Sequence, residues 1–199
     1  MNKMKSGMKG DNMAIKIYID QGHNPRSPNT GAEGNGFAEQ DITYEVGQRL
    51  ATLLRNNGNF EVRVSRPTEN TQLGTSNASS LQARVNGANS WDADYFISIH
   101  TNASSSVSAS GSEALVYNVP SIAEELGEDI LVGLNNSTGL RNRGIKVRPG
   151  LYVLRKTNMP AVLIEIGFIS NPGDASLMAN NPELFARGIY DGILRFLNL

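Results

Sequence analysis

Tyr-Phe-Ile-Ser-Ile-His at residues 95–100 and Ala-Val-Leu-Ile-Glu-Ile at residues 161–166 are the two stretches that decide the fold. Each is a short run of mainly β-branched, aromatic and other apolar residues. Such runs are typical of strands buried on both faces, at the centre of a parallel or mixed sheet that helices cover. The two stretches therefore predict the middle of an α/β sheet.

Outward from these stretches, apolar runs alternate with segments of helical spacing. Further strands are predicted at 15–20, 60–65, 113–117 and 151–154, and helices at 37–56, 76–90, 121–138 and from Pro182 onward. The pattern predicts one α/β domain with a mixed, mostly parallel, twisted sheet of about six strands and helices on both faces. This domain is expected to span residues 14–199. Residues 1–13, dominated by Lys, Gly, Asn and Asp, are expected to be a disordered leader.

Composition excludes several classes of function. The chain has 199 residues, 39% hydrophobic content, a formal net charge of -1 and no cysteine, so disulfides, thiolate zinc sites and cysteine nucleophiles are excluded. No long basic run favours a nucleic-acid partner. No apolar stretch is long enough to span a bilayer, and the N-terminal residues contain no apolar core of an export signal. Nothing demands a dimer, so a monomer is expected.

The chain has two histidines, and both follow or end a predicted strand. His23 lies just past the first strand, and His100 ends the strand at 95–100. Ligands of open α/β sheets bind outside the carboxyl ends of the strands, so both side chains are expected at one edge. Imidazole nitrogen is a good zinc ligand. The alternative for either histidine alone is an ordinary hydrogen-bonded residue at a loop or strand end.

Glu39 lies where a helix surface should be apolar. It precedes Ile42 and Val46 on the predicted helix at 37–56 and falls in the middle of its buried stripe. A buried carboxylate is costly unless it is paired, and a metal ion would offset that cost. The alternative is a capping role, with Gly36 as the N-cap and Glu39 in the first turn.

Glu165 is set inside the apolar run 160–168. A carboxylate there must be paired, bind a metal or shift its pKa. One interpretation is a catalytic base at the end of a central strand. The alternative is a buried ion pair with an arginine such as Arg84 or Arg66.

A set of two histidines and one glutamate leaves one position of a tetrahedral zinc ion open, which is the catalytic pattern. The ion would acidify water and polarise a carbonyl, and a second glutamate could transfer the proton. The usual H-E-x-x-H helix motif is absent.

Several motifs in order resemble the zinc-dependent N-acetylmuramoyl-L-alanine amidases, often called amidase type 3. The resemblance runs from about residue 15 to residue 197. The matching segments are IDQGH at 19–23, the loop leading to Glu39, LQAR at 81–84, ADYFISIHTNA at 93–103, GSE at 111–113 and MPAVLIEIGFISN at 159–171.

The resemblance implies that His23, Glu39 and His100 bind one zinc ion and that Glu165 is the catalytic general base and acid. It places Asn102 and Glu113 close to the site, as candidate substrate-binding residues. The alternative for both is ordinary hydrogen bonding in a loop or at a strand edge. The implied reaction is hydrolysis, by zinc-activated water, of the amide between N-acetylmuramic acid and L-alanine in peptidoglycan, with the protein acting outside the cell at the wall. The alternatives are another zinc amidohydrolase or a non-catalytic cell-wall-binding module.

Overall fold

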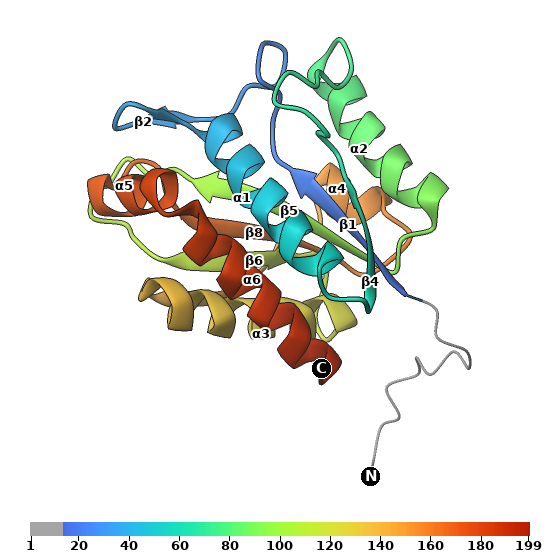
Figure 1. Cartoon of the computed structure of the whole chain (residues 1–199). Helices are drawn as coiled ribbons and strands as arrows, with labels where there is room; N and C mark the ends of the chain where they lie inside the picture. Colours follow the sequence, from blue (N-terminus) through green and yellow to red (C-terminus); the bar gives the residue numbers. More distant parts are fainter. Residues whose placement is uncertain (1–13) are drawn as a thin grey trace.

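The computed structural model describes residues 14–199, which form three layers, with a six-stranded sheet between two groups of helices (Figure 1). The predicted fold class is confirmed, whereas the predicted leader at residues 1–13 lies outside the described residues. The strand order is β4-β1-β5-β8-β6-β7. The strands are β1 (Ile15–Gln21), β4 (Phe60–Val64), β5 (Tyr95–Asn102), β6 (Ser112–Val116), β7 (Asn142–Val147) and β8 (Ala161–Phe168).

The two stretches that decide the fold are the two central strands, β5 and β8. They run parallel to each other, and β1 and β4 continue the parallel arrangement on one side. On the other side β6, which a serine-rich loop connects to β5, is antiparallel to β8, and β7 is parallel to β6. The first residues of β6 and β7 therefore lie at the same edge of the sheet as the last residues of β1, β5 and β8.

One face of the sheet packs against three long helices. These are α1 (Glu39–Arg55), α3 (Ile122–Thr138) and α6 (Pro182–Leu197). Ile17, Ile97 and Ile164 point from the sheet into this core. Helices α3 and α6 approach closely through glycines, because a Cβ added at Gly192 would collide with the Cα of Ile130.

The opposite face is covered by α2 (Asn77–Trp91) and α4 (Tyr152–Lys156). Their apolar side chains pack on Phe96, Leu115 and Leu163. Two residues beyond Phe96, and therefore on the same face of β5, Ser98 is a buried polar side chain. Among residues 14–199, no helix is long and apolar enough to cross a bilayer.

The predicted strand at 151–154 is wrong. Residues 152–156 form the short helix α4, which turns both Val153 and Leu154 toward the sheet. A strand would send two adjacent side chains to opposite faces. The sixth strand is instead β7, which was not predicted because its sequence, NRGIKV, is polar and it pairs only with β6 at the edge.

Three smaller elements were also not predicted. The loop after β1 contains a short hairpin of β2 (Glu33–Gly34) and β3 (Phe37–Ala38), so the predicted helix at 37–56 begins two residues later, at Glu39. Helix α5 (Pro172–Asn180) follows β8.

Candidate metal centre

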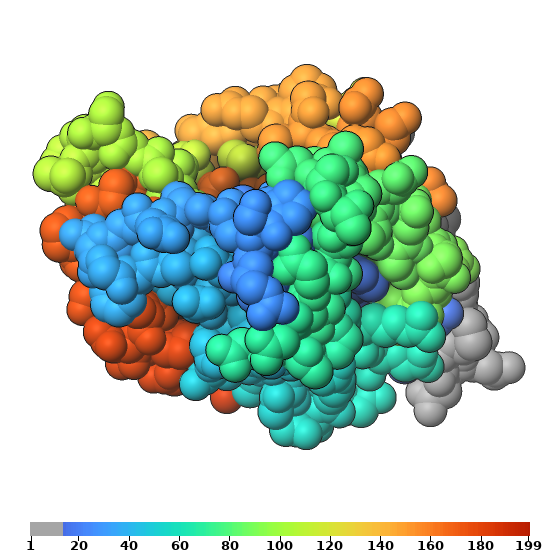
Figure 2. Space-filling view, turned by 90° about the horizontal axis from the view of Figure 1, so that it is seen from above, coloured from blue at the N-terminus to red at the C-terminus, as the bar shows by residue number. Residues whose placement is uncertain are grey.

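Four of the predicted site residues meet at the edge where β1, β5 and β8 end. His23 follows β1, His100 lies near the end of β5, and Glu39 is the first residue of α1. Glu165 on β8 is the direct neighbour of His100 in the parallel pairing. In the view onto this edge (Figure 2), the blue segment after β1 lies beside the green segment that precedes α2, and the orange segment around α4 rises on the far side.

The Glu39 carboxylate lies between the two imidazoles. Its Oε2 atom is 3.2 Å from His23 Nε2, and its Oε1 atom is 3.1 Å from His100 Nδ1. The two imidazole rings meet edge to face, with 4.8 Å between their centroids. One ligand atom from each of the three residues falls within 4.8 Å of the other two, a spacing at which one metal ion could bind all three.

Backbone amides fix the orientation of the Glu39 carboxylate. The Thr101 N–H donates to Oε1 and the Ala32 N–H donates to Oε2, both at 2.9 Å. Burial alone would raise the pKa of Glu39, but the hydrogen bonds and charges of His100 and His23 outweigh burial and hold the pKa well below its ordinary value. The carboxylate is therefore ionised, as a metal ligand must be.

The alternative capping role for Glu39 does not take the predicted form. The N-cap of α1 is Ala38, which makes no side-chain capping hydrogen bond, and Gly36 lies outside the helix. The Glu39 side chain binds the strand and loop amides described above.

Two glycines allow the loop after β1 to lie against the metal-ligand candidates. A Cβ at Gly22 would lie 2.6 Å from His100 Cε1, and a Cβ at Gly31 would lie 2.7 Å from Glu39 Oε2. Contacts below 3.0 Å essentially never occur for a real Cβ. Any side chain at either position would therefore displace a member of the cluster.

Glu165 has none of the ion pairs considered as alternatives. Arg84 instead pairs with Asp20, and Arg66 donates to the backbone carbonyls of Gln40 and Glu69. The Oε2 atom of Glu165 is buried and has no hydrogen-bond partner among the described residues. Burial, followed by the charges of Glu39 and Glu113, raises the pKa of Glu165 to about 8. This carboxyl group can therefore exchange a proton near neutral pH.

Asn102 and Glu113 lie beside Glu165 and bind each other. Asn102 Nδ2 donates to Glu113 Oε1 at 2.8 Å, and Glu113 is paired with Glu165 across the antiparallel strands β6 and β8. Arg143 Nε donates to the other oxygen of Glu113 at 3.1 Å. The sequence did not point to Arg143, because the polar edge strand that carries it was itself not predicted.

The chemistry of this cluster suits zinc. Two imidazoles and one carboxylate are a known catalytic zinc set. In addition, the second nitrogen of His23, Nδ1, is buried and lacks a partner among the described residues. The cluster therefore fits zinc in the types of its donor atoms and in the short distances between them.

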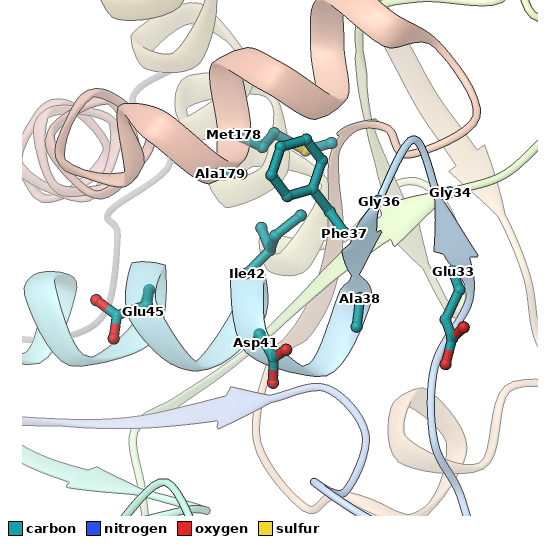
Figure 3. A pocket seen from close by; sticks show the side chains of 10 residues that line it. All are labelled: Glu33, Gly34, Gly36, Phe37, Ala38, Asp41, Ile42, Glu45, Met178 and Ala179. Carbon is teal, nitrogen blue, oxygen red and sulfur yellow. The ribbon is translucent and has the colours of Figure 1, made fainter.

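A separate groove lies between α1, the β2–β3 hairpin and α5. It has a volume of about 750 Å³ and is lined by Phe37, Ile42 and Met178, with Asp41 and Glu45 at its margin (Figure 3). None of the predicted site residues lines it. The chemistry described above is therefore at the sheet edge and not in this groove.

The fold and the site define a broad class: an α/β domain that carries two histidines and a glutamate at its sheet edge, close enough together to hold a metal ion. Comparison with known proteins narrows the class: residues 17–195 match the family model described as N-acetylmuramoyl-L-alanine amidase. The chain belongs to this family.

Similar proteins agree with this assignment. The chain is 35% identical to the N-acetylmuramoyl-L-alanine amidase LytC of Bacillus subtilis over 98% of its own length, but it spans only 37% of that relative. It is 36% identical to the amidase CwlM of Bacillus licheniformis, covering 93% of this chain and 70% of the relative. The crystal structure of the amidase from Clostridium difficile 630 superposes with a TM-score of 0.83 at 31% identity, over 93% of this chain and 97% of that one.

Proposed function

We propose that this chain hydrolyses the amide bond between N-acetylmuramic acid and L-alanine in bacterial peptidoglycan. In this proposal His23, Glu39 and His100 hold one zinc ion and Glu165 transfers the proton. The observation that carries the proposal is the cluster itself, in which the buried Glu39 carboxylate lies 3.1–3.2 Å from both imidazoles and Glu165 is the strand neighbour of His100. Family membership supplies the bond that is cut.

When bound, zinc supplies a Lewis acid that acidifies water and polarises a carbonyl oxygen. The residues of the chain do the rest. Two backbone amides hold the Glu39 carboxylate in its orientation and would support it as a ligand. Glu165, whose pKa is raised to about 8, accepts the proton of the attacking water and donates it to the leaving nitrogen.

Asn102 and Glu113 are proposed to contact the substrate beside the cut bond. Their mutual hydrogen bond fixes the Asn102 amide next to Glu165 on the neighbouring strands. The catalytic domain is proposed to comprise residues 14–199 and to act as a monomer outside the cell, at the wall, where this substrate occurs.

The first test is digestion of purified peptidoglycan by the zinc-loaded protein, with analysis of the products. We expect a free lactyl group on the sugar and an intact stem peptide with a new amino terminus. Chelation should abolish release and zinc should restore it. Glu165→Gln should lower kcat by on the order of 10²–10⁴ while binding zinc like the wild-type chain.

Two outcomes would favour a rival function, and a third would contradict the role of Glu165. Cleavage inside the stem peptide would indicate a different zinc amidohydrolase. Wall binding that survives both chelation and Glu165→Gln, with no product, would indicate a binding module. Activity that is unaffected by Glu165→Gln would show that Glu165 is structural.

A further inference from the structure

Arg84 is a buried cation outside the cluster whose hydrogen bonds converge on the turn that carries His23. It projects from α2, is 1% exposed, and lies against the end of β1. Nη1 donates to Asp20 Oδ1 at 2.6 Å and to the Gln21 carbonyl at 2.5 Å. Nη2 donates to the His23 carbonyl at 2.5 Å. One guanidinium thus spans the turn from the end of the strand to the backbone of His23.

This turn needs such support because its backbone is strained. His23 has a φ of 66°, in the left-handed region that residues with a side chain seldom occupy. The conformation is unfavourable for an L residue, so it persists only where surrounding contacts hold it. The Gly22 N–H donates to the Ile99 carbonyl on one side of His23, and Arg84 binds the His23 carbonyl on the other.

Arg84 is itself held rigidly. The Asp20 carboxylate that pairs with it also accepts a hydrogen bond from Ser98 Oγ, at 2.8 Å, on the neighbouring strand β5. The same strand carries His100. Through Asp20, Arg84 therefore connects the His23 turn to β5, the strand that carries His100.

We propose that Arg84 is a positioning residue for the metal centre: its fork of hydrogen bonds holds the left-handed backbone of His23 and so aims the imidazole at Glu39 and His100. The proposal rests on the proposed function, since it requires that the cluster binds zinc. The shortest polar contacts of Arg84 are with Asp20 and with the carbonyls of Gln21 and His23, and two longer ones reach Ser65 Oγ and Asn24 Oδ1. None of these partners is an imidazole atom, so the effect of Arg84 passes through the His23 backbone.

Arg66 provides a matched control. It is also fully buried, at 0% exposed, and like Arg84 has an Nε without a partner among the described residues. Its guanidinium donates to the carbonyls of Gln40 and Glu69. Gln40 lies in α1, whose helical hydrogen bonds maintain the backbone without Arg66, whereas the His23 turn has no such ladder.

The test measures zinc affinity by competition with a chromophoric chelator in wild type, Arg84→Lys and Arg66→Lys, together with the free energy of unfolding of each metal-free protein. Lysine keeps the charge but replaces the planar fork with a point charge that cannot bridge the turn. We expect Arg84→Lys to bind zinc about tenfold or more weakly than Arg66→Lys does, when the two variants lose the same free energy of unfolding. The visible spectrum of the cobalt-substituted protein should change in Arg84→Lys only.

If zinc affinity falls only in step with stability in both variants, or if the cobalt spectrum of Arg84→Lys matches wild type, the positioning role is overturned. If Arg84→Lys does not fold, Asp20→Asn decides, because it loosens the Arg84 anchor with little change in volume. Weaker zinc binding by Asp20→Asn supports the role, and unchanged binding overturns it. Failure of the wild-type chain to bind zinc would instead overturn the proposed function.

Discussion

Glu165 combines a position inside an apolar strand with a carboxyl oxygen that has no partner among the described residues. Its pKa of about 8 in the folded protein, against 4.5 for an ordinary glutamate, ties its protonation to stability. Between these two values the folded chain binds more protons at this site than the unfolded chain does. The contribution of Glu165 to the free energy of unfolding is therefore fully present below pH 4.5 and is lost as the pH rises through about 8.

We expect Glu165→Gln to stabilise the metal-free protein at pH 8 relative to wild type and to have little effect at pH 4.5. One pKa unit corresponds to about 1.4 kcal/mol, so the difference at the higher pH should be on the order of a few kcal/mol. Chemical denaturation in the presence of chelator, repeated across this pH range, measures it. A stability difference that does not grow with pH would contradict the raised pKa.

The residues most informative in the sequence were those whose chemistry conflicted with their surroundings. Glu39 on a buried helix face and Glu165 in an apolar strand both stand out in this way, and the structure brings both to the sheet edge beside His23 and His100. Asn102 was found only through resemblance to a family. The Arg84 contacts could not be predicted, because they depend on how α2 packs against the end of β1.

Gly22 makes a close contact that the sequence did not reveal. We expect Gly22→Ala to weaken zinc binding by about tenfold or more, because the new methyl group would displace the His100 imidazole. Gly58→Ala is the control, since a Cβ at Gly58 would have no atom within 4 Å and alanine fits there. Isothermal titration of the metal-free proteins compares them. Equal affinities for the two variants would show that the imidazole can move without loss of the metal.

At the scale of elements, strands and helices with strong periodicity were predicted well, and those without it were not. The central strands β5 and β8 and the amphipathic helix α6 follow from their own sequences. The edge strand β7 does not, since it is polar and is stabilised only by pairing with β6. Likewise the apolar run that became α4 is too short for its periodicity to separate strand from helix.

The contact between α3 and α6 leads to a prediction about stability alone. We expect Gly192→Ala to destabilise the protein by about 1–3 kcal/mol, because its Cβ would collide with the Ile130 backbone and force the helices apart. Both helices pack on the face opposite α2. Zinc affinity should therefore stay close to wild type. Urea denaturation and zinc titration check the two expectations, with Gly150→Ala, which has open space around it, as the control.

At the scale of the whole molecule, the fold class followed from the alternation of elements, and the order of the strands did not. The reversal at β6 brings the start of that strand, with Glu113, to the edge where β5 and β8 end. Nothing in the periodicity of residues 112–116 distinguishes this antiparallel placement from a parallel one. The arrangement decides which polar residues surround Glu165.

The serine-rich loop between β5 and β6 divides the centre into two consecutive parts of the chain. All three metal-ligand candidates precede this loop, and Glu165 and Glu113 follow it. A chain cut within residues 104–109 would thus give one fragment with the three metal-ligand candidates and another with Glu165, the proposed proton carrier. Since β5 and β8 are paired neighbours, we expect the co-expressed fragments to reassociate and recover activity that neither has alone. The domain could then serve as a split reporter, in which wall cleavage signals that two attached proteins have met.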